Sequence, residues 1–286
     1  MANLKEIRNR ISSVTSTMKI TSAMKMVSAA KLKKAQDAIT AMRPYSEKLT
    51  DLMSNFSEII SSSSISYLSE TRDVKNVLVV SICSNKGLCG AFNSNVIKQS
   101  LSLKNEEEFK GANFSYLTIG KKANDILSKT ENIISNHSNV YDNLVYDEVA
   151  NVSEKIVEEF NLGNFDKVLI VFNSFKNAAN QIVKTEQFLP IESLDETNKT
   201  GDYIFEPSME QIVSRLVPKS LKIQLFKSIR DSFAGEHGAR MTAMHKATDN
   251  ATELRDELKL TYNKARQAAI TNEILEIVSG AEALNG

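Results

Sequence analysis

The stretch Lys5–Gln36 reads KEIRNRISSVTSTMKITSAMKMVSAAKLKKAQ, and apolar residues recur through it in alternating steps of three and four. The series starts just before the stretch and runs past its end, through Leu4, Ile7, Ile11, Val14, Met18, Leu32, Ala35, Ile39 and Met42. Such spacing is typical of a helix that packs along another helix over a long distance. We therefore expect a long coiled-coil helix at the N-terminus.

The middle of this helix departs from the apolar pattern. There the same frame falls on polar or small residues, namely Thr21, Lys25 and Ser28. The neighbouring apolar residues are shifted by one position, to Ile20, Met24 and Val27. We therefore expect the face that the helix turns outward to change midway along its length.

The helical pattern has one internal break before it ends. Pro44 normally ends a helix, but the three-four spacing resumes after it at Tyr45 and Leu49. This favours a kink or a restart over a stop. The serine run at 61–64 then predicts the end of the helix near residue 60.

A second helical pattern runs from Ser208 to near Gly280, with Pro218 bounding a first short turn. Five of the nine members of its seam are alanine or threonine, and the seam runs through Met244, Ala247, Ala251, Leu254, Leu258, Thr261, Ala265, Ala268 and Leu275. A helix of about 65 residues is about 100 Å long, and a pattern far beyond about 25 residues favours a coiled coil. The two ends of the chain are therefore expected to form one antiparallel coiled coil.

The centre of the chain has a different pattern. Short β-branched stretches at 74–82, 114–119 and 167–172 predict strands, and 181–189 and 203–205 are candidates for further strands or a hairpin. Helical patterns at 93–103, 121–128 and 152–160 lie between them. This alternation predicts a parallel, Rossmann-like α/β domain. The expected organisation is an N-terminal helix at 1–60, an α/β domain at 61–207 and a C-terminal helix at 208–286.

Composition excludes several classes of function. The formal net charge of the 286 residues is zero, which argues against a generally basic nucleic-acid binder. Residues 1–48 nevertheless carry ten basic and three acidic side chains, and this excess predicts an acidic partner surface. Two cysteines and three scattered histidines argue against a disulfide framework or a structural metal site. Without a signal peptide or an apolar run of about 20 residues, we expect a cytosolic, reduced, soluble protein.

Four segments resemble one known family, the gamma subunit of the F-type rotary ATP synthase. Two are the terminal helices, Lys5–Gln36 and ELRDELKLTYNKARQAAITNEILEIVSGAEAL at Glu253–Leu284. The others are GLCGAFN at Gly87–Asn93 and GEHGARMTAMHKATDN at Gly235–Asn250. Their order and spacing agree with the family over essentially the whole chain. Small departures from the family pattern are Ala91, Ser28 and Gly235.

The resemblance implies a non-catalytic shaft that stands inside a hexamer of alpha and beta subunits. It implies that the globular domain lies beside the epsilon subunit on the membrane ring of c subunits. Proton flow then turns the ring and the shaft together, on the cytoplasmic side of a bacterial inner membrane. No cofactor or metal is expected in this chain.

The resemblance also implies which side chains contact the beta subunits or steady the coil. These residues are Met24, Lys25, Arg240, Arg266, Gln267, Thr271 and Glu273. Arg266 and Gln267 form a polar pair within an alanine-rich helix, which suits hydrogen bonds to an enclosing loop. Without the resemblance, a solvated helix face is the better interpretation of such residues.

The glycine-containing GLCGAFN segment has neither the Walker pattern nor Gly-x-Gly-x-x-Gly. We expect a strand-to-helix turn, with Asn93 or Ser94 capping the next helix, and a packed Cys89 rather than a nucleophile. Two alternatives remain open at this point. One is an adaptor that displays a coiled-coil arm on an α/β module, and the other is a nucleotide-dependent enzyme, for which the sequence lacks a phosphate loop.

Overall fold

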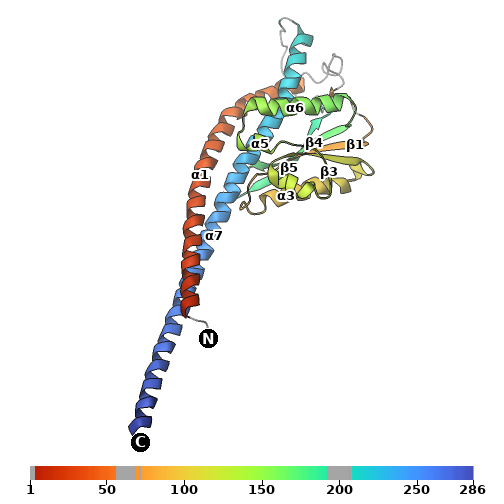
Figure 1. The fold of residues 1–286 in the computed structure, drawn as a ribbon. Helices are drawn as coiled ribbons and strands as arrows, with labels where there is room; N and C mark the ends of the chain where they lie inside the picture. The colour runs from red at the N-terminus through yellow and green to blue at the C-terminus, as the bar shows by residue number, and fades with distance from the viewer. Residues whose placement is uncertain (1–3, 56–67, 71, 192–205, 207, 286) are drawn as a thin grey trace. The chain divides into compact units, whose positions relative to one another are not determined.

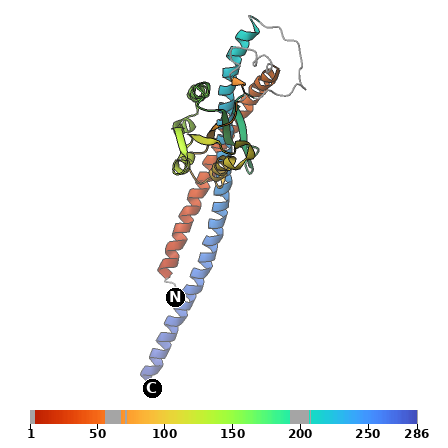
Figure 2. The same cartoon turned by 90° about the vertical axis from the view of Figure 1, so that its right-hand side faces the viewer.

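The fold is given by a computed structural model that describes residues 4–55, 68–70, 72–191, 206 and 208–285 (Figures 1 and 2). The chain divides into two compact units. Met1–Ser28 with Met241–Gly286 form the first, here called the helical unit, and Ala29–Arg240 form the second, the α/β unit. Two long helices, α1 (Leu4–Asn55) and α7 (Met209–Asn285), each contribute to both units. The expected division near 60 and 207 follows the ends of these helices, whereas the compact units divide each helix in two.

The α/β unit is built on one five-stranded sheet with the order β3-β2-β1-β4-β5. The strands are β1 (Asn76–Ile82), β2 (Asn113–Ile119), β3 (Asn132–Asn136), β4 (Lys167–Phe175) and β5 (Gln181–Leu189). The first four are mutually parallel, and β5 pairs antiparallel with β4. The predicted Rossmann-like fold is confirmed, together with the hairpin at 181–189.

Helices cover both faces of this sheet (Figure 1). They include α3 (Phe92–Ser102), α4 (Lys121–Leu127), α5 (Ser138–Asp142) and α6 (Tyr146–Asn161), with short 3-10 turns at Leu103–Asn105 and Glu107–Phe109. Because successive strand residues point to opposite faces, Val77 and Val79 pack with α3 and α4, while Leu78 and Val80 pack with α6 and the first half of α7. The result is a three-layer unit with two apolar cores.

Some elements differ from expectation. β3 and α5 were not predicted because both are short, and the side chains of β3 alternate between exposed and half-buried at the sheet edge. Helix α1 continues through Pro44, and α7 continues through Pro218, which bounds no separate turn. The serine run at 61–64 and the candidate strand at 203–205 lie outside the described residues.

In the helical unit, α1 and α7 lie side by side and antiparallel (Figures 1 and 2). The Thr248 hydroxyl donates a hydrogen bond of 2.8 Å to the Thr21 hydroxyl, and a guanidinium nitrogen of Arg255 lies 3.5 Å from Sδ of Met18. Because residues that follow Thr248 on α7 meet residues that precede Thr21 on α1, the expected antiparallel coiled coil is confirmed.

The seam on α7 is only half as predicted. Met244 and Ala251 are buried and Leu258 and Ala265 are half-buried, as the pattern indicated. The alternate positions lie one residue later, at Thr248, Arg255, Tyr262 and Ala269. Leu254 is instead 47% exposed. The predicted and the observed heptad frames agree at Met244, Ala251, Leu258 and Ala265 and differ at every other seam position. The prediction selected the frame with more apolar residues, but the other frame is the one that packs.

Candidate functional site

The outward face of α1 in the helical unit carries large apolar side chains. Ile20, Met26 and Val27 are 60%, 65% and 57% exposed, while Thr21 and Ser28 are buried in the seam. The packing face therefore stays the same through this stretch, and the expected change of face midway is wrong. Polar and small residues pack inward here, and the apolar residues that they displaced from the seam form the surface.

The expected contact residues fall into two groups on this unit. Met24 and Lys25 are half-buried on α1 beside the exposed apolar face, and Arg266, Gln267, Thr271 and Glu273 are exposed on α7. The Thr271 hydroxyl donates to the carbonyl of Gln267 at 2.9 Å, one turn earlier. Because residues seven apart share a helix face, Arg266 and Glu273 lie on the same face of α7.

The C-terminal turns of α7 have no packing partner among the described residues. Both views show α7 extending beyond the first described turn of α1 (Figures 1 and 2). Among the residues whose burial is described, Ala269 is the last that is half-buried, and every side chain from 270 to 281 is exposed. This end is apolar, with Ile270 at 45%, Ile274 at 55%, Leu275 at 59%, Ile277 at 71% and Val278 at 50% exposure. We call residues 270–281 the apolar tip.

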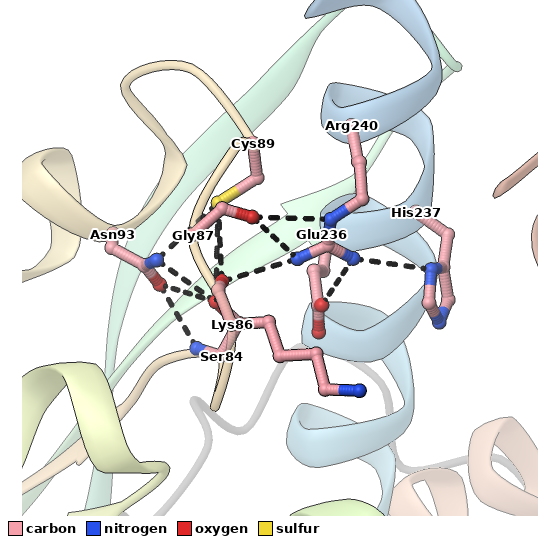
Figure 3. Close-up of polar contacts among 8 residues, drawn as sticks. All are labelled: Ser84, Lys86, Gly87, Cys89, Asn93, Glu236, His237 and Arg240. Carbon is pink, nitrogen blue, oxygen red and sulfur yellow. Dashed lines mark hydrogen bonds and ion pairs between the residues drawn. The ribbon is translucent and has the colours of Figure 1, made fainter. Parts of the chain in front are cut away.

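Arg240 differs from the other expected contact residues because it lies buried inside the α/β unit, at 7% exposure. Its guanidinium donates to the carbonyl of Gly87 at 3.1 and 3.2 Å and to the carbonyl of Lys86 at 3.1 Å. It also pairs with the carboxylate of Glu236 at 2.5 Å (Figure 3). The structure thus gives Arg240 an intramolecular contact, with the loop at Lys86 and Gly87, that the sequence did not indicate.

The loop that receives Arg240 is the GLCG segment between β1 and α3. The side-chain oxygen of Asn93 accepts a hydrogen bond of 2.9 Å from the backbone amide of Ser84, and its side-chain nitrogen donates one of 2.8 Å to the Ser84 hydroxyl. Asn93 therefore closes the loop, and the expectation that Asn93 or Ser94 caps α3 is wrong, since Ala91 holds the N-cap without a side-chain hydrogen bond. Leu88 has φ 62°, a conformation that costs a non-glycine residue about 1–2 kcal/mol.

The electrostatics of this cluster follow from burial. Burial raises the pKa of Glu236, and the adjacent Arg240 opposes that shift. His237 is 4% exposed, and burial, together with the positive charges of Arg240 and Lys31, lowers its pKa to about 4. Cys83 and Cys89 are both buried, and burial raises the pKa of each thiol. The expectation that Cys89 is a packed residue is confirmed.

The His237 shift predicts a dependence of stability on pH. In the folded chain His237 stays neutral down to about pH 4, whereas the unfolded chain binds a proton near pH 6.5. The unfolded state therefore holds more protons within this window, so the free energy of unfolding falls as the pH is lowered through it. Relative to His237→Gln, the free energy of unfolding of the wild type should fall by about 3 kcal/mol through this window. Urea unfolding of both proteins across this range measures the difference, and parallel pH profiles would contradict the prediction.

Neither a metal centre nor a membrane span is found in the part of the chain that the structure describes. Within it, His, Cys, Asp and Glu side chains form no group of three that suits a metal ion. No helix in the same described residues combines the length and the apolar character that crossing a membrane requires.

A coiled coil with an α/β unit inserted between its two helices and with an exposed apolar tip defines a class of coiled-coil proteins, and the comparisons with known proteins narrow that class. The ATP synthase family model matches residues 3–284. Two relatives, ATP synthase gamma chains from Flavobacterium psychrophilum and Christiangramia forsetii, are 64% and 62% identical, each with both chains covered completely. The chain belongs to the ATP synthase gamma chain family.

Solved structures agree with this assignment. A chain of the Euglena gracilis mitochondrial ATP synthase, from its OSCP/F1/c-ring structure, has a TM-score of 0.70 at 20% identity, covering 98% of this chain and 94% of that one. A chain of the Tetrahymena thermophila mitochondrial ATP synthase central stalk and c-ring has a TM-score of 0.56 at 25% identity, covering 80% and 99%. The fold is therefore that of chains from ATP synthase complexes.

Proposed function

We propose that this chain is the rotating central stalk of a proton-driven ATP synthase. In this role it is a non-catalytic shaft that carries torque between the membrane ring of c subunits and the catalytic hexamer of alpha and beta subunits. The observation that carries the proposal is the apolar tip, a helix end whose large apolar side chains have no partner in the described chain. Exposed apolar surface of this extent marks a protein interaction site, and a ring of subunits that encloses the helix supplies one.

Physical reasoning supports a shaft without threefold symmetry. Three chemically identical beta subunits hold different conformations only if something asymmetric contacts them. The helical unit is asymmetric because the described part of α1 begins beside α7 short of the apolar tip. Its net positive charge also lies on α1, since residues 4–28 carry five basic and one acidic side chain, whereas residues 241–285 carry five basic and seven acidic ones. Rotation then changes which beta subunit meets which face, and so shifts its equilibrium between open and closed states.

Magnitudes indicate that shape contributes more than charge. Driving a subunit from nearly all open to nearly all closed takes about 5.5 kcal/mol of differential contact energy. Exposed ion pairs contribute about 1 kcal/mol or less each. We therefore assign most of this differential contact energy to steric exclusion by the coiled coil and the apolar tip. The exposed polar residues Arg266, Gln267, Thr271 and Glu273 guide the motion, and Met24 and Lys25 do so from α1.

The remaining partners follow from the same proposal. The α/β unit docks beside the epsilon subunit and on the c-ring, and the complex lies at a bacterial inner membrane with this chain on the cytoplasmic side. The high identity to chains from Flavobacterium psychrophilum and Christiangramia forsetii supports the bacterial placement.

The proposal is tested with the double variant Arg266→Ala/Gln267→Ala in the assembled complex. ATP synthesis in sealed vesicles should fall by about fivefold while assembly stays intact, since the two exposed contacts together contribute about 1 kcal/mol. The control is Lys155→Ala/Glu158→Ala, which changes an exposed pair on α6 and should leave synthesis unchanged. Unchanged synthesis in the Arg266/Gln267 variant counts against these contacts. A chain that co-purifies with no ATPase activity would instead favour a structural adaptor.

A further inference from the structure

The contact between α7 and the GLCG loop continues into the sheet. Arg240 reaches the carbonyls of Lys86 and Gly87, and the Ser84 hydroxyl donates to the same Lys86 carbonyl at 2.6 Å. Ser84 follows the end of β1, the middle strand of the sheet, and Asn93 binds Ser84 from the first turn of α3. These hydrogen bonds form a continuous path from the guanidinium of Arg240 to the end of β1 (Figure 3). A force on Arg240 is therefore transmitted to the sheet along this path.

The same turn of α7 also fits closely against the sheet hairpin. A Cβ atom added at Gly238 would lie 3.1 Å from the carbonyl oxygen of Ala178, in the turn between β4 and β5. One added at Gly235 would lie 3.2 Å from the ring of Phe92 and 3.3 Å from Gln181. The helix backbone thus approaches both α3 and the hairpin at the level of Arg240, and little room is left for it to turn.

The position of this contact along the chain is informative. The α/β unit ends at Arg240, and α7 continues from Met241 into the helical unit. The clustered contacts therefore hold the last turn of α7 that belongs to the α/β unit. Any twist that the helix carries must pass this turn before it reaches the sheet.

Stability alone explains the buried ion pair poorly. A buried arginine–carboxylate pair is often no more stabilising than apolar residues of the same volume, but it defines one geometry. The arginine fork here is used fully, with donors to two carbonyls and to Glu236. Such a fork permits one rotational setting of the helix, whereas apolar packing tolerates several.

We propose that Arg240 is a positioning residue that locks α7 against rotation about its own axis within the α/β unit. Torque then passes between the helix and the sheet without slipping at this turn. The inference rests on the proposed function of the chain as a rotating stalk, and it assigns one part of that function to a specific set of intramolecular hydrogen bonds.

The test uses Arg240→Met/Glu236→Gln, which removes the pair without leaving an unpaired buried charge. In the complete complex in sealed vesicles, ATP hydrolysis should persist while protons pumped per ATP fall by at least about twofold, the lower end of what mutations along a coupling path produce. In the isolated chain, amide hydrogen exchange at residues 84–90 should become faster. The matched control is Arg230→Met, the same substitution on α7 at a half-buried arginine that lies 4.9 Å from the Phe226 ring. It should change neither readout.

A second variant keeps the test valid if the double variant does not fold. Arg240→Lys keeps the charge near Glu236 but lacks the planar fork that reaches both carbonyls, and it should show the same direction of change in pumping. A wild-type pumping ratio in both variants, with faster exchange at residues 84–90, would make Arg240 merely structural and overturn the inference. A wild-type complex that hydrolyses ATP without pumping would overturn the proposed function as well, so the two failures are distinguishable.

Discussion

Replacing Ile270, Ile274 and Ile277 together with asparagine is expected to weaken the affinity of this chain for the proposed hexamer of alpha and beta subunits by at least about tenfold. Burying one isoleucine side chain contributes about 1.5–3 kcal/mol, and about 1.4 kcal/mol corresponds to a tenfold change in affinity. The three residues are 45%, 55% and 71% exposed in the chain alone, so this surface is available for burial by a partner. Dissociation of the assembled complex on dilution, followed by size-exclusion chromatography, measures the effect.

The isolated chain supplies the contrast for this prediction. Because these side chains are exposed, the free energy of unfolding of the chain alone should change by no more than about 0.5 kcal/mol. Leu162→Asn is the control for loss of exposed apolar surface, since Leu162 is 74% exposed but lies in the α/β unit. Equal dissociation of the tip variant and the wild type would show that the apolar tip is not held by the hexamer.

Gly120→Ala is expected to lower the free energy of unfolding by about 4 kcal/mol or more. Gly120 has φ 109°, and an added Cβ would lie 1.9 Å from the carbonyl oxygen of Cys83 and 2.6 Å from its carbonyl carbon. Both atoms belong to the backbone at the end of β1, so no side chain can move aside. Relief requires the ends of β1 and β2 to separate, which breaks the hydrogen bond from the Cys83 amide to the Ile119 carbonyl at 2.9 Å.

Gly111→Ala separates the steric effect from the backbone effect. Gly111 has φ 88°, but an added Cβ there meets nothing within 4 Å. This control should cost about 1–2 kcal/mol, the penalty of a positive φ alone. Urea unfolding of the isolated chain compares the two variants, and similar losses in both would mean that the contact with Cys83 is relieved by a small local shift.

The sequence indicated the organisation of the fold correctly for physical reasons that are local. Heptad spacing requires a partner helix, so both long helices and their antiparallel pairing followed from the pattern. Strand-helix alternation predicted the parallel strands β1, β2 and β4. The edge strand β3 was not predicted, because an edge strand needs no apolar face and its composition therefore does not distinguish it from a loop.

The environments of the candidate contact residues were harder to predict from the sequence than the fold. Arg266, Gln267, Thr271 and Glu273 are exposed as a contact surface requires, and their role in binding stays a prediction. Arg240 had been grouped with them, although its environment depends on residues more than 150 positions earlier in the chain. Asn93 is likewise a residue type that often caps helices, but its side chain hydrogen-bonds to Ser84 because the turn brings the two residues together.

By itself, the sequence determined the class of fold, the two helices and the family, because periodicity and ordered motifs are properties of the chain in one dimension. Only the tertiary structure decided which of two heptad frames on α7 packs, that Arg240 is buried against the GLCG loop, and that the C-terminal turns have no packing partner among the residues the structure describes. Each of these depends on which distant residues meet, and the free energy of a contact is set by both partners rather than by either stretch of sequence alone.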